Sequence, residues 1–184
     1  MKTESTVMYI LRLSLILFVI AGIVALALAG VNSITAPAIE KLNAEKTQQA
    51  IEAVLPGGYD EEITDYADAT GLVSKVYKGA NGYALEVKPG GFDNTITMMV
   101  GVGFDGNVLG ISIVSHTETA GLGAVAAAKT SAGEAFRGQF VGKSGSVLVT
   151  KDGGTVEAIT GATITSRAVC DGVNAALACV ATLG

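Results

Sequence analysis

Side chains that commonly carry enzyme chemistry or bind metals are scarce in this sequence of 184 residues, which has one histidine and two cysteines. Cys170 and Cys179 are nine positions apart in a predicted helix, about 13.5 Å along its axis, which is too far for a disulfide between them. We expect both to pack as small apolar residues. The sequence shows no metal-ligand spacing, no Ser/His/Asp arrangement and no lysine behind a glycine-rich phosphate loop. It therefore gives no sign of a metal centre, a serine hydrolase or a Walker-type nucleotide site.

The single histidine, His116, has two interpretations. It precedes Glu118 on a loop that ends in Gly121 and Gly123, so it could act as a proton relay. More often a histidine in such a place makes a hydrogen bond that fixes the loop, and we favour this second interpretation.

Basic residues are also few, because 12 Lys and Arg stand against 17 Asp and Glu. Five acids crowd into one stretch without a base among them: Asp60, Glu61, Glu62, Asp65 and Asp68. We interpret this stretch as a solvated loop after Pro56. A surface with this charge repels phosphate backbones, which argues against nucleic-acid binding.

Charge is absent from Leu13 to Val31, and this absence predicts a single transmembrane helix. At about 1.5 Å per residue, the stretch nearly matches a hydrocarbon core of about 30 Å. The alternative is a cleaved signal peptide, because residues 27–29 (Ala-Leu-Ala) resemble a cleavage site. We favour the anchor, since the apolar run exceeds the about 7 to 15 residues of a signal peptide's hydrophobic region.

Flanking charges do not decide the topology, because two basic residues lie on each side of the span. A short leader before a large domain favours a cytoplasmic N-terminus and an exported domain. We therefore expect a single-pass protein of the cell (inner) membrane with its C-terminal domain on the extracytoplasmic side. The expected parts are a leader (1–12), a transmembrane helix (13–31), a helical stalk (32–55) and one domain (56–184).

Alternating apolar residues in the domain predict strands joined by tight turns. The segments 73–78 and 83–88 flank a Gly-Ala-Asn-Gly turn, and the second reads as a half-buried strand. The segments 96–102 and 109–113 flank Asp105 and Gly106, which is a strong hairpin signal. We therefore expect an α+β fold in which helices flank a twisted, mainly antiparallel sheet.

Shorter elements are predicted between this hairpin and the C-terminus. Ser131 and Glu134 have capping-box spacing and predict the start of a short helix. Strands are expected at 146–150 and 156–159, on either side of an Asp-Gly-Gly turn. From about Thr165 to Leu183, apolar residues recur at helical spacing.

A cluster of hydroxyls around Gly161 enters this last helix. A helix N-terminus presents unpaired N–H groups and a partial positive charge, so it attracts phosphate. Gly161 permits a strained turn, and Ala162 leaves room for a ligand against the backbone. The hydroxyls of Thr160, Thr163, Thr165 and Ser166 could donate to phosphate oxygens or form a phosphoester. The competing interpretation, favoured by spacing alone, is that Thr165 or Ser166 caps the helix.

Two motifs together resemble a known family. Residues 116–123 (His-Thr-Glu-Thr-Ala-Gly-Leu-Gly) and then Thr160-Gly161-Ala162-Thr163 are similar to the FMN-binding domain shared by two membrane complexes. These motifs resemble the G subunit of the Rnf-type ion-translocating oxidoreductase, and its relative, the C subunit of the sodium-translocating NADH:quinone oxidoreductase. The resemblance covers nearly the whole chain. The compact size of this chain favours the Rnf-type protein. This chain departs mildly from the family, with Glu157-Ala158 before the second motif and Ala120 in the loop.

The resemblance implies covalently attached FMN. It implies that FMN is joined to the hydroxyl of Thr163 by a phosphoester, which a dedicated flavin transferase makes. Thr165 and Ser166 are then left to cap the helix. Thr160, Gly161 and Ala162 would shape the phosphate turn. The flavin side would be lined by Glu118, Thr119, Gly121 and Leu122.

The resemblance also implies a function. The chain would be the electron-transfer subunit of a redox-driven ion pump of the ferredoxin:NAD oxidoreductase type, without turnover of its own and with other membrane and iron–sulfur subunits as partners. Three alternatives stay open. They are the C subunit of the sodium-translocating NADH:quinone oxidoreductase, a membrane-anchored flavoprotein of an extracytoplasmic electron-transfer chain without ion pumping, and a domain that has lost its flavin.

Overall fold

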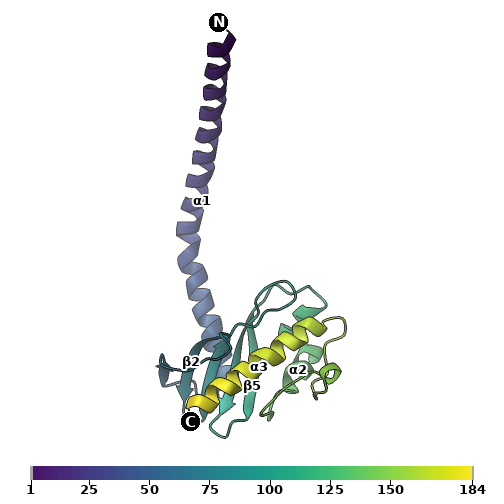
Figure 1. Cartoon of the computed structure of the whole chain (residues 1–184). Helices are drawn as coiled ribbons and strands as arrows, with labels where there is room; N and C mark the ends of the chain where they lie inside the picture. Colours follow the sequence, from purple (N-terminus) through teal and green to yellow (C-terminus); the bar gives the residue numbers. More distant parts are fainter. Residues whose placement is uncertain (1, 184) are drawn as a thin grey trace. The chain divides into compact units, whose positions relative to one another are not determined.

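The computed structural model describes the backbone of residues 2–183 and the side chains of residues 7–183. Contacts divide the chain into a first unit that ends at Glu45 and a second unit that begins at Lys46. Helix α1 (Lys2–Val54) crosses this division and continues through Pro37 (Figure 1). The segment 32–55, predicted to be helical, therefore forms the C-terminal part of α1 as far as Val54.

The first unit is helix alone, with large apolar side chains exposed along its length. Within the described residues, Val7–Val54 is the one helix that is long and apolar enough to cross a membrane. Its most apolar window of 18 residues has a mean hydropathy of 2.8, and none of that window is buried. An apolar surface of this kind lacks a protein partner within the described chain, which agrees with the predicted transmembrane segment.

The second unit is built on one antiparallel sheet whose five strands follow each other in chain order. The strands are β1 (Glu61–Ile63), β2 (Val73–Gly79), β3 (Gly82–Val87), β4 (Thr97–Gly103) and β5 (Val108–Ser115). Both predicted hairpins are present as β2–β3 and β4–β5. The expected α+β fold is thereby confirmed.

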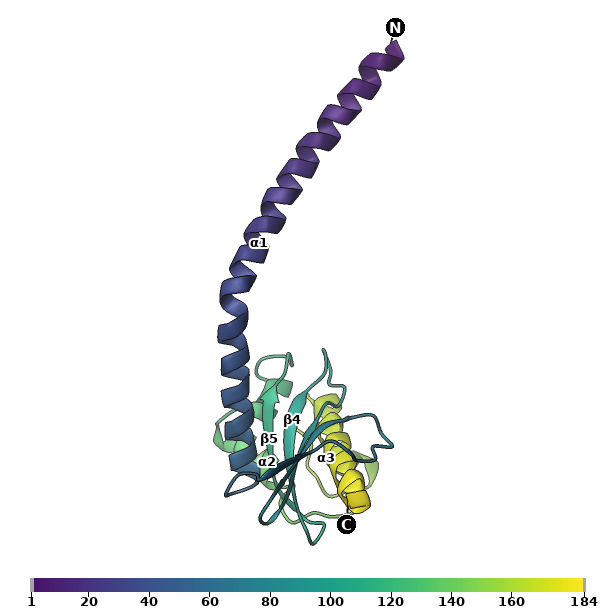
Figure 2. The ribbon, with the colours of Figure 1, turned by 90° about the vertical axis from the view of Figure 1, so that its left-hand side faces the viewer.

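Helices cover both faces of this sheet. On one face lies α3 (Thr163–Leu183) (Figure 2). Its Val169 and Val173 pack into a core with Leu85 of β3. On the other face lies a second cluster. The end of α1 contributes Ala50, Ile51 and Val54 to it, the next residue contributes Leu55, and the sheet contributes Tyr77, Ala84 and Met99. All six residues of β3 are consequently buried, so the prediction of a half-buried strand there is wrong.

Glycine allows the closest approach between α1 and the sheet. A side chain added at Gly101 of β4 would collide with the backbone carbonyl of Val54. The last turn of α1 can therefore lie directly against the strand, which strengthens the packing of the second cluster.

The predicted strands at 146–150 and 156–159 are also wrong, because only one parallel bridge forms there, between Val149 and Val156. Backbone bonds join residues 148–150 to residues 154–156 in a local turn. Side chains bind the backbone on either side of this turn. Asn174 pairs with the backbone N–H and carbonyl of Val147, at 2.8 and 2.9 Å. Gln139 does the same for Glu157, at 2.7 and 3.2 Å. With these donors and acceptors taken, no strand partner is needed.

The short helices lie between β5 and α3. They are the 3-10 turn η1 (Gly123–Ala127), α2 (Ser131–Gly138) and the 3-10 turn η2 (Thr150–Asp152). Helix α2 starts where the capping-box spacing predicts, but its N-cap is Thr130, whose hydroxyl accepts from the backbone of Gly133 at 3.4 Å.

Cys170 and Cys179 are both free and buried in the core, as predicted. Burial raises the pKa of the Cys170 thiol to about 12.

Candidate functional site

The site is built around the entrance to α3, which begins at Thr163. Gly161 has a φ of 75°, the left-handed conformation that glycine tolerates. Because the helix starts two residues earlier than predicted, Thr165 and Ser166 lie inside its first turn and do not cap it. Ser166 instead donates to the carbonyl of Ala162 at 2.9 Å and accepts from the N–H of Ile159 at 3.0 Å. This buried hydroxyl fixes the turn that leads into the helix.

Thr165 points into the domain, where its hydroxyl donates to the carboxylate of Glu118. The same carboxylate accepts from the backbone N–H of Phe92 at 2.8 Å and of Asp93 at 3.4 Å. Glu118 is only 6% exposed, and side chains at Gly91 or Gly123 would collide with its oxygens. One buried carboxylate therefore joins the β3–β4 loop, the loop after β5 and the first turn of α3.

These segments enclose a cavity of about 310 Å³. This volume is near the lower end of the about 300–1,000 Å³ typical of small-molecule sites. The cavity brings together six of the residues predicted from the sequence: Glu118, Thr119, Leu122, Gly161, Ala162 and Thr163. Its other lining residues are Phe92, Gly123, Lys151, Ile164 and Thr165.

Two predicted residues, Thr160 and Gly121, do not line this cavity. Both line a separate hollow of about 580 Å³ next to α2. The turn at Gly161 lies between Thr160, which faces the hollow next to α2, and Thr163, which faces the cavity of about 310 Å³. The two threonines of the motif therefore face different spaces.

The cavity has an apolar rim formed by Phe92, Leu122 and Ile164, which are 65%, 43% and 50% exposed. Sequence reasoning missed Phe92 and Ile164. An aromatic residue directly after Gly90 and Gly91 is a signal that could have been noticed, since glycines let backbone come close to a ligand. Ile164 gives no such signal, because an apolar residue at a helix start is unremarkable.

The polar end of the cavity holds a lysine that the sequence did not reveal. The amino group of Lys151, on η2, donates to the hydroxyl of Thr163 at 3.2 Å. The neighbouring Asp152 forms two hydrogen bonds with Arg167 of α3, at 2.7 and 2.6 Å. These bonds lower the pKa of the Asp152 carboxyl and raise the pKa of the Arg167 guanidinium.

His116 does not line this cavity, which argues against a proton relay there. Its Nδ1 atom is buried without a hydrogen-bond partner in the described part of the chain. The favoured loop hydrogen bond is therefore not made by this nitrogen.

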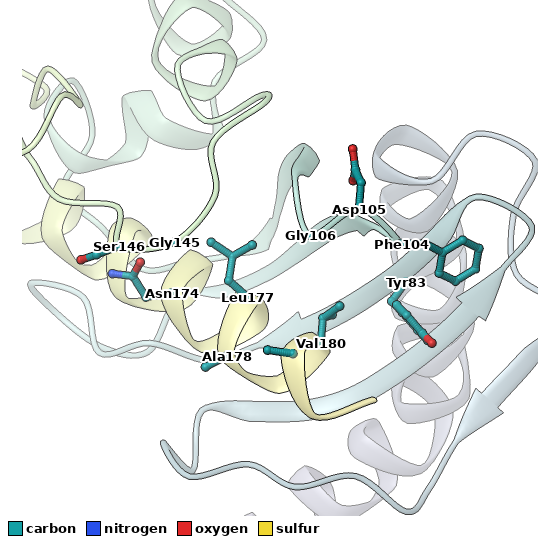
Figure 3. A pocket seen from close by; sticks show the side chains of 11 residues that line it. Tyr83, Phe104, Asp105, Gly106, Gly145, Ser146, Asn174, Leu177, Ala178 and Val180 are labelled. Atoms are coloured by element: carbon teal, nitrogen blue, oxygen red, sulfur yellow. The ribbon is translucent and has the colours of Figure 1, made fainter. Parts of the chain in front are cut away.

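A larger hollow lies elsewhere on the domain, against the C-terminal half of α3 (Figure 3). It measures about 840 Å³ and is lined mainly by apolar side chains such as Phe104 and Leu177. Its amide side chain, Asn174, is already committed to the backbone of Val147. This hollow contains none of the residues that the sequence predicts to bind the cofactor, so the smaller cavity is the candidate cofactor site.

Comparison with known proteins agrees with this choice. Residues 91–178 match the FMN-binding domain family, and every residue lining the 310 Å³ cavity falls within that segment. The chain is 36% identical to the G subunit of the Na(+)-translocating ferredoxin:NAD(+) oxidoreductase complex of Acetobacterium woodii, over 90% of this chain and 88% of that protein. The chain belongs to the family of G subunits of ion-translocating oxidoreductase complexes.

Other members of this family show similar or shorter coverage. The G subunit of the ion-translocating oxidoreductase complex of Methanosarcina acetivorans is 33% identical over 86% of this chain and 88% of its own length. A third relative, the G subunit of the proton-translocating ferredoxin:NAD(+) oxidoreductase complex of Clostridium ljungdahlii, is 43% identical over 54% of each chain. Together with the apolar helix, membership in this family makes the chain a membrane-anchored subunit of a multi-subunit oxidoreductase complex.

The cavity fits the cofactor of its domain family. One end offers a helix N-terminus, a hydroxyl and a cation, which suit a phosphate. The other end offers exposed apolar side chains, which suit the flat, weakly polar ring system of a flavin. The residues present therefore match the two chemically different parts of FMN.

Proposed function

We propose that this chain is the electron-transfer subunit of a membrane-bound, redox-driven ion pump and that it carries FMN as a phosphoester on Thr163. The observation that supports this most is the position of Thr163. Its hydroxyl lies at the polar end of a cavity that falls entirely within the segment matched to FMN-binding domains.

In this proposal the turn and the helix start hold the phosphate. Gly161 and Ala162 expose backbone at the entrance to α3, where the unpaired N–H groups and the helix dipole favour negative charge. Thr160 supports the turn from its other side, because it faces the separate hollow. Ser166 fixes the geometry through its bonds to Ala162 and Ile159.

Phe92, Leu122 and Ile164 of the apolar rim, with Glu118 and Thr119, would hold the ring system, and Gly121 would shape the loop that carries Leu122. When bound, FMN supplies the redox chemistry, and the protein sets its orientation, its exposure to water and its potential. Phe92, Leu122 and Ile164 exclude water from the ring. The Glu118 carboxylate holds the two walls at a fixed separation, since it bonds to Phe92 and Thr165 at once.

The proposal extends to partners and topology. Other membrane and iron–sulfur subunits exchange electrons with the flavin, and a flavin transferase attaches it. Residues 1–12 form a cytoplasmic leader, 13–31 span the membrane, 32–55 form a stalk, and the domain 56–184 lies on the extracytoplasmic side of the cell membrane.

Flavin attachment can be tested directly. The full chain is produced with and without a flavin transferase, and the proteins are separated by denaturing electrophoresis under ultraviolet light. We expect a fluorescent band that needs the transferase, is lost in Thr163→Ala and persists in Thr163→Ser. Thr182→Ala, at the far end of α3, serves as the control. A fluorescent Thr163→Ala band, or no fluorescence with transferase present, contradicts the proposal.

A further inference from the structure

Among the described residues, Lys151 has no carboxylate partner, although it is followed directly by an acid. The ion pairs found there join Lys75 to Glu62, Lys88 to Glu86 and Arg167 to Asp152. The Asp152 carboxylate is occupied by both the Nε and Nη2 groups of Arg167. Lys151 also helps to lower the pKa of the neighbouring Asp152 carboxyl, but its side-chain hydrogen bond goes to the hydroxyl of Thr163, which is neutral.

The same Arg167–Asp152 pair fixes where this charge lies. Arg167 is four residues after Thr163, so the two side chains lie on the same face of α3, one turn apart. Binding Asp152 to this face places η2, and Lys151 with it, beside the helix start. A bidentate pair between a guanidinium and a carboxylate holds this arrangement more tightly than a single contact can.

We propose that Lys151 is the cation that binds the flavin phosphate and that Arg167, through Asp152, is its positioning residue. The inference rests on the proposed function, because it concerns the phosphate esterified to Thr163. A diester phosphate keeps one negative charge, and the Lys151 amino group already lies within hydrogen-bond distance of the ester oxygen's position. A charge-assisted bond between the two is stronger than the bond to the neutral hydroxyl.

The same contact assists attachment. The oxygen of Thr163 bonds to the flavin-side phosphorus of a flavin dinucleotide. The phosphoanhydride P–O bond breaks, the nucleoside monophosphate leaves with the bonding electrons, and the hydroxyl proton passes to the transferase. No oxidant or reductant is needed. Lys151 holds the hydroxyl in place before this step and faces the phosphate oxygens during it.

The first measurement is the initial rate of flavin incorporation into the full chain at limiting transferase. We expect Lys151→Ala to slow incorporation about 10-fold, the size of one charge-assisted hydrogen bond. Lys151→Arg should retain most of the incorporation rate. The rate of Arg167→Lys should lie between those of Lys151→Ala and Lys151→Arg. Lys143→Ala is the matched control, because Lys143 also donates to a threonine, Thr155, at 2.6 Å.

The second measurement is the ³¹P resonance of the loaded protein, which reports the charge beside the phosphate. Lys151→Ala should shift this resonance, and Lys143→Ala should not. The assignment of Lys151 is overturned if Lys151→Ala leaves the rate of flavin incorporation unchanged. It is also overturned if Lys151→Ala leaves the ³¹P resonance unchanged while flavin is still on Thr163. Flavin that stays attached in Thr163→Ala overturns the proposed function instead, so the two failures are distinguishable. Lys151 is exposed, and a thermal unfolding curve for each variant checks that folding is intact.

Discussion

At the scale of single residues, Glu118 joins three segments of the site through its hydrogen bonds. It was predicted to line the flavin, and the structure adds that it bonds to segments 26 and 47 positions away in sequence. A buried carboxylate is costly unless hydrogen bonds compensate it. Two backbone N–H groups and one hydroxyl do so here, and these same bonds join segments that line the cavity.

We expect Glu118→Ala to lower the free energy of unfolding by about 2–4 kcal/mol, because it leaves the N–H of Phe92 and the hydroxyl of Thr165 without their partner. Glu118→Gln should lower the free energy of unfolding by less, since glutamine keeps the shape of the side chain and one acceptor oxygen. Urea unfolding of the domain measures both. Glu52→Ala removes an exposed acid and should change little. Equal stabilities for Glu118→Ala and Glu52→Ala would contradict the bridging role of Glu118.

At the scale of elements, local patterns predicted some parts and could not predict others. The β2–β3 and β4–β5 hairpins follow from alternation and from turns such as Asp105-Gly106, which are local signals. The contact from Thr165 to Glu118 joins residues 47 positions apart, and no local pattern marks it. The segments 146–150 and 156–159 alternate like strands, yet their backbone bonds close a local turn around η2, and the side chains of Asn174 and Gln139 bind Val147 and Glu157 at its ends. Lys151 was missed because its role depends on how η2 packs against α3.

The end of α1 is also an element whose role became clear only in the structure. Ile51 is 1% exposed and packs against the sheet, whereas Ile39 is 53% exposed. We expect Ile51→Ala to lower the free energy of unfolding by about 2–5 kcal/mol, from lost burial and the cavity left behind. Ile39→Ala should leave the unfolding transition unchanged. Chemical unfolding in detergent compares the two, and similar effects would mean that residues 46–54 are not part of the domain core.

At the scale of the whole molecule, the chain combines a membrane helix with a cofactor domain. The proposed topology can be tested because both native thiols are buried, and burial raises the pKa of both Cys170 and Cys179. At neutral pH the thiols stay protonated, and a protonated thiol is a poor nucleophile. The native chain therefore offers a low background for thiol labelling.

We expect Asp65→Cys, at an exposed position of the domain, to react with a membrane-impermeant maleimide added to intact spheroplasts. The unaltered chain should remain unlabelled until it is denatured. Labelling of Asp65→Cys only after the membrane is broken would place the domain on the cytoplasmic side and contradict the proposed orientation.

The position of α3 after all five strands in the sequence has a consequence for the order of folding. Its first turn supplies Thr163 and the partner of Glu118, and its later turns fill the core with Val169 and Val173. The cavity is therefore incomplete until α3 has been synthesised and has packed against the sheet. If FMN is attached to Thr163 as proposed, its attachment to a complete site must follow the folding of α3 rather than precede it.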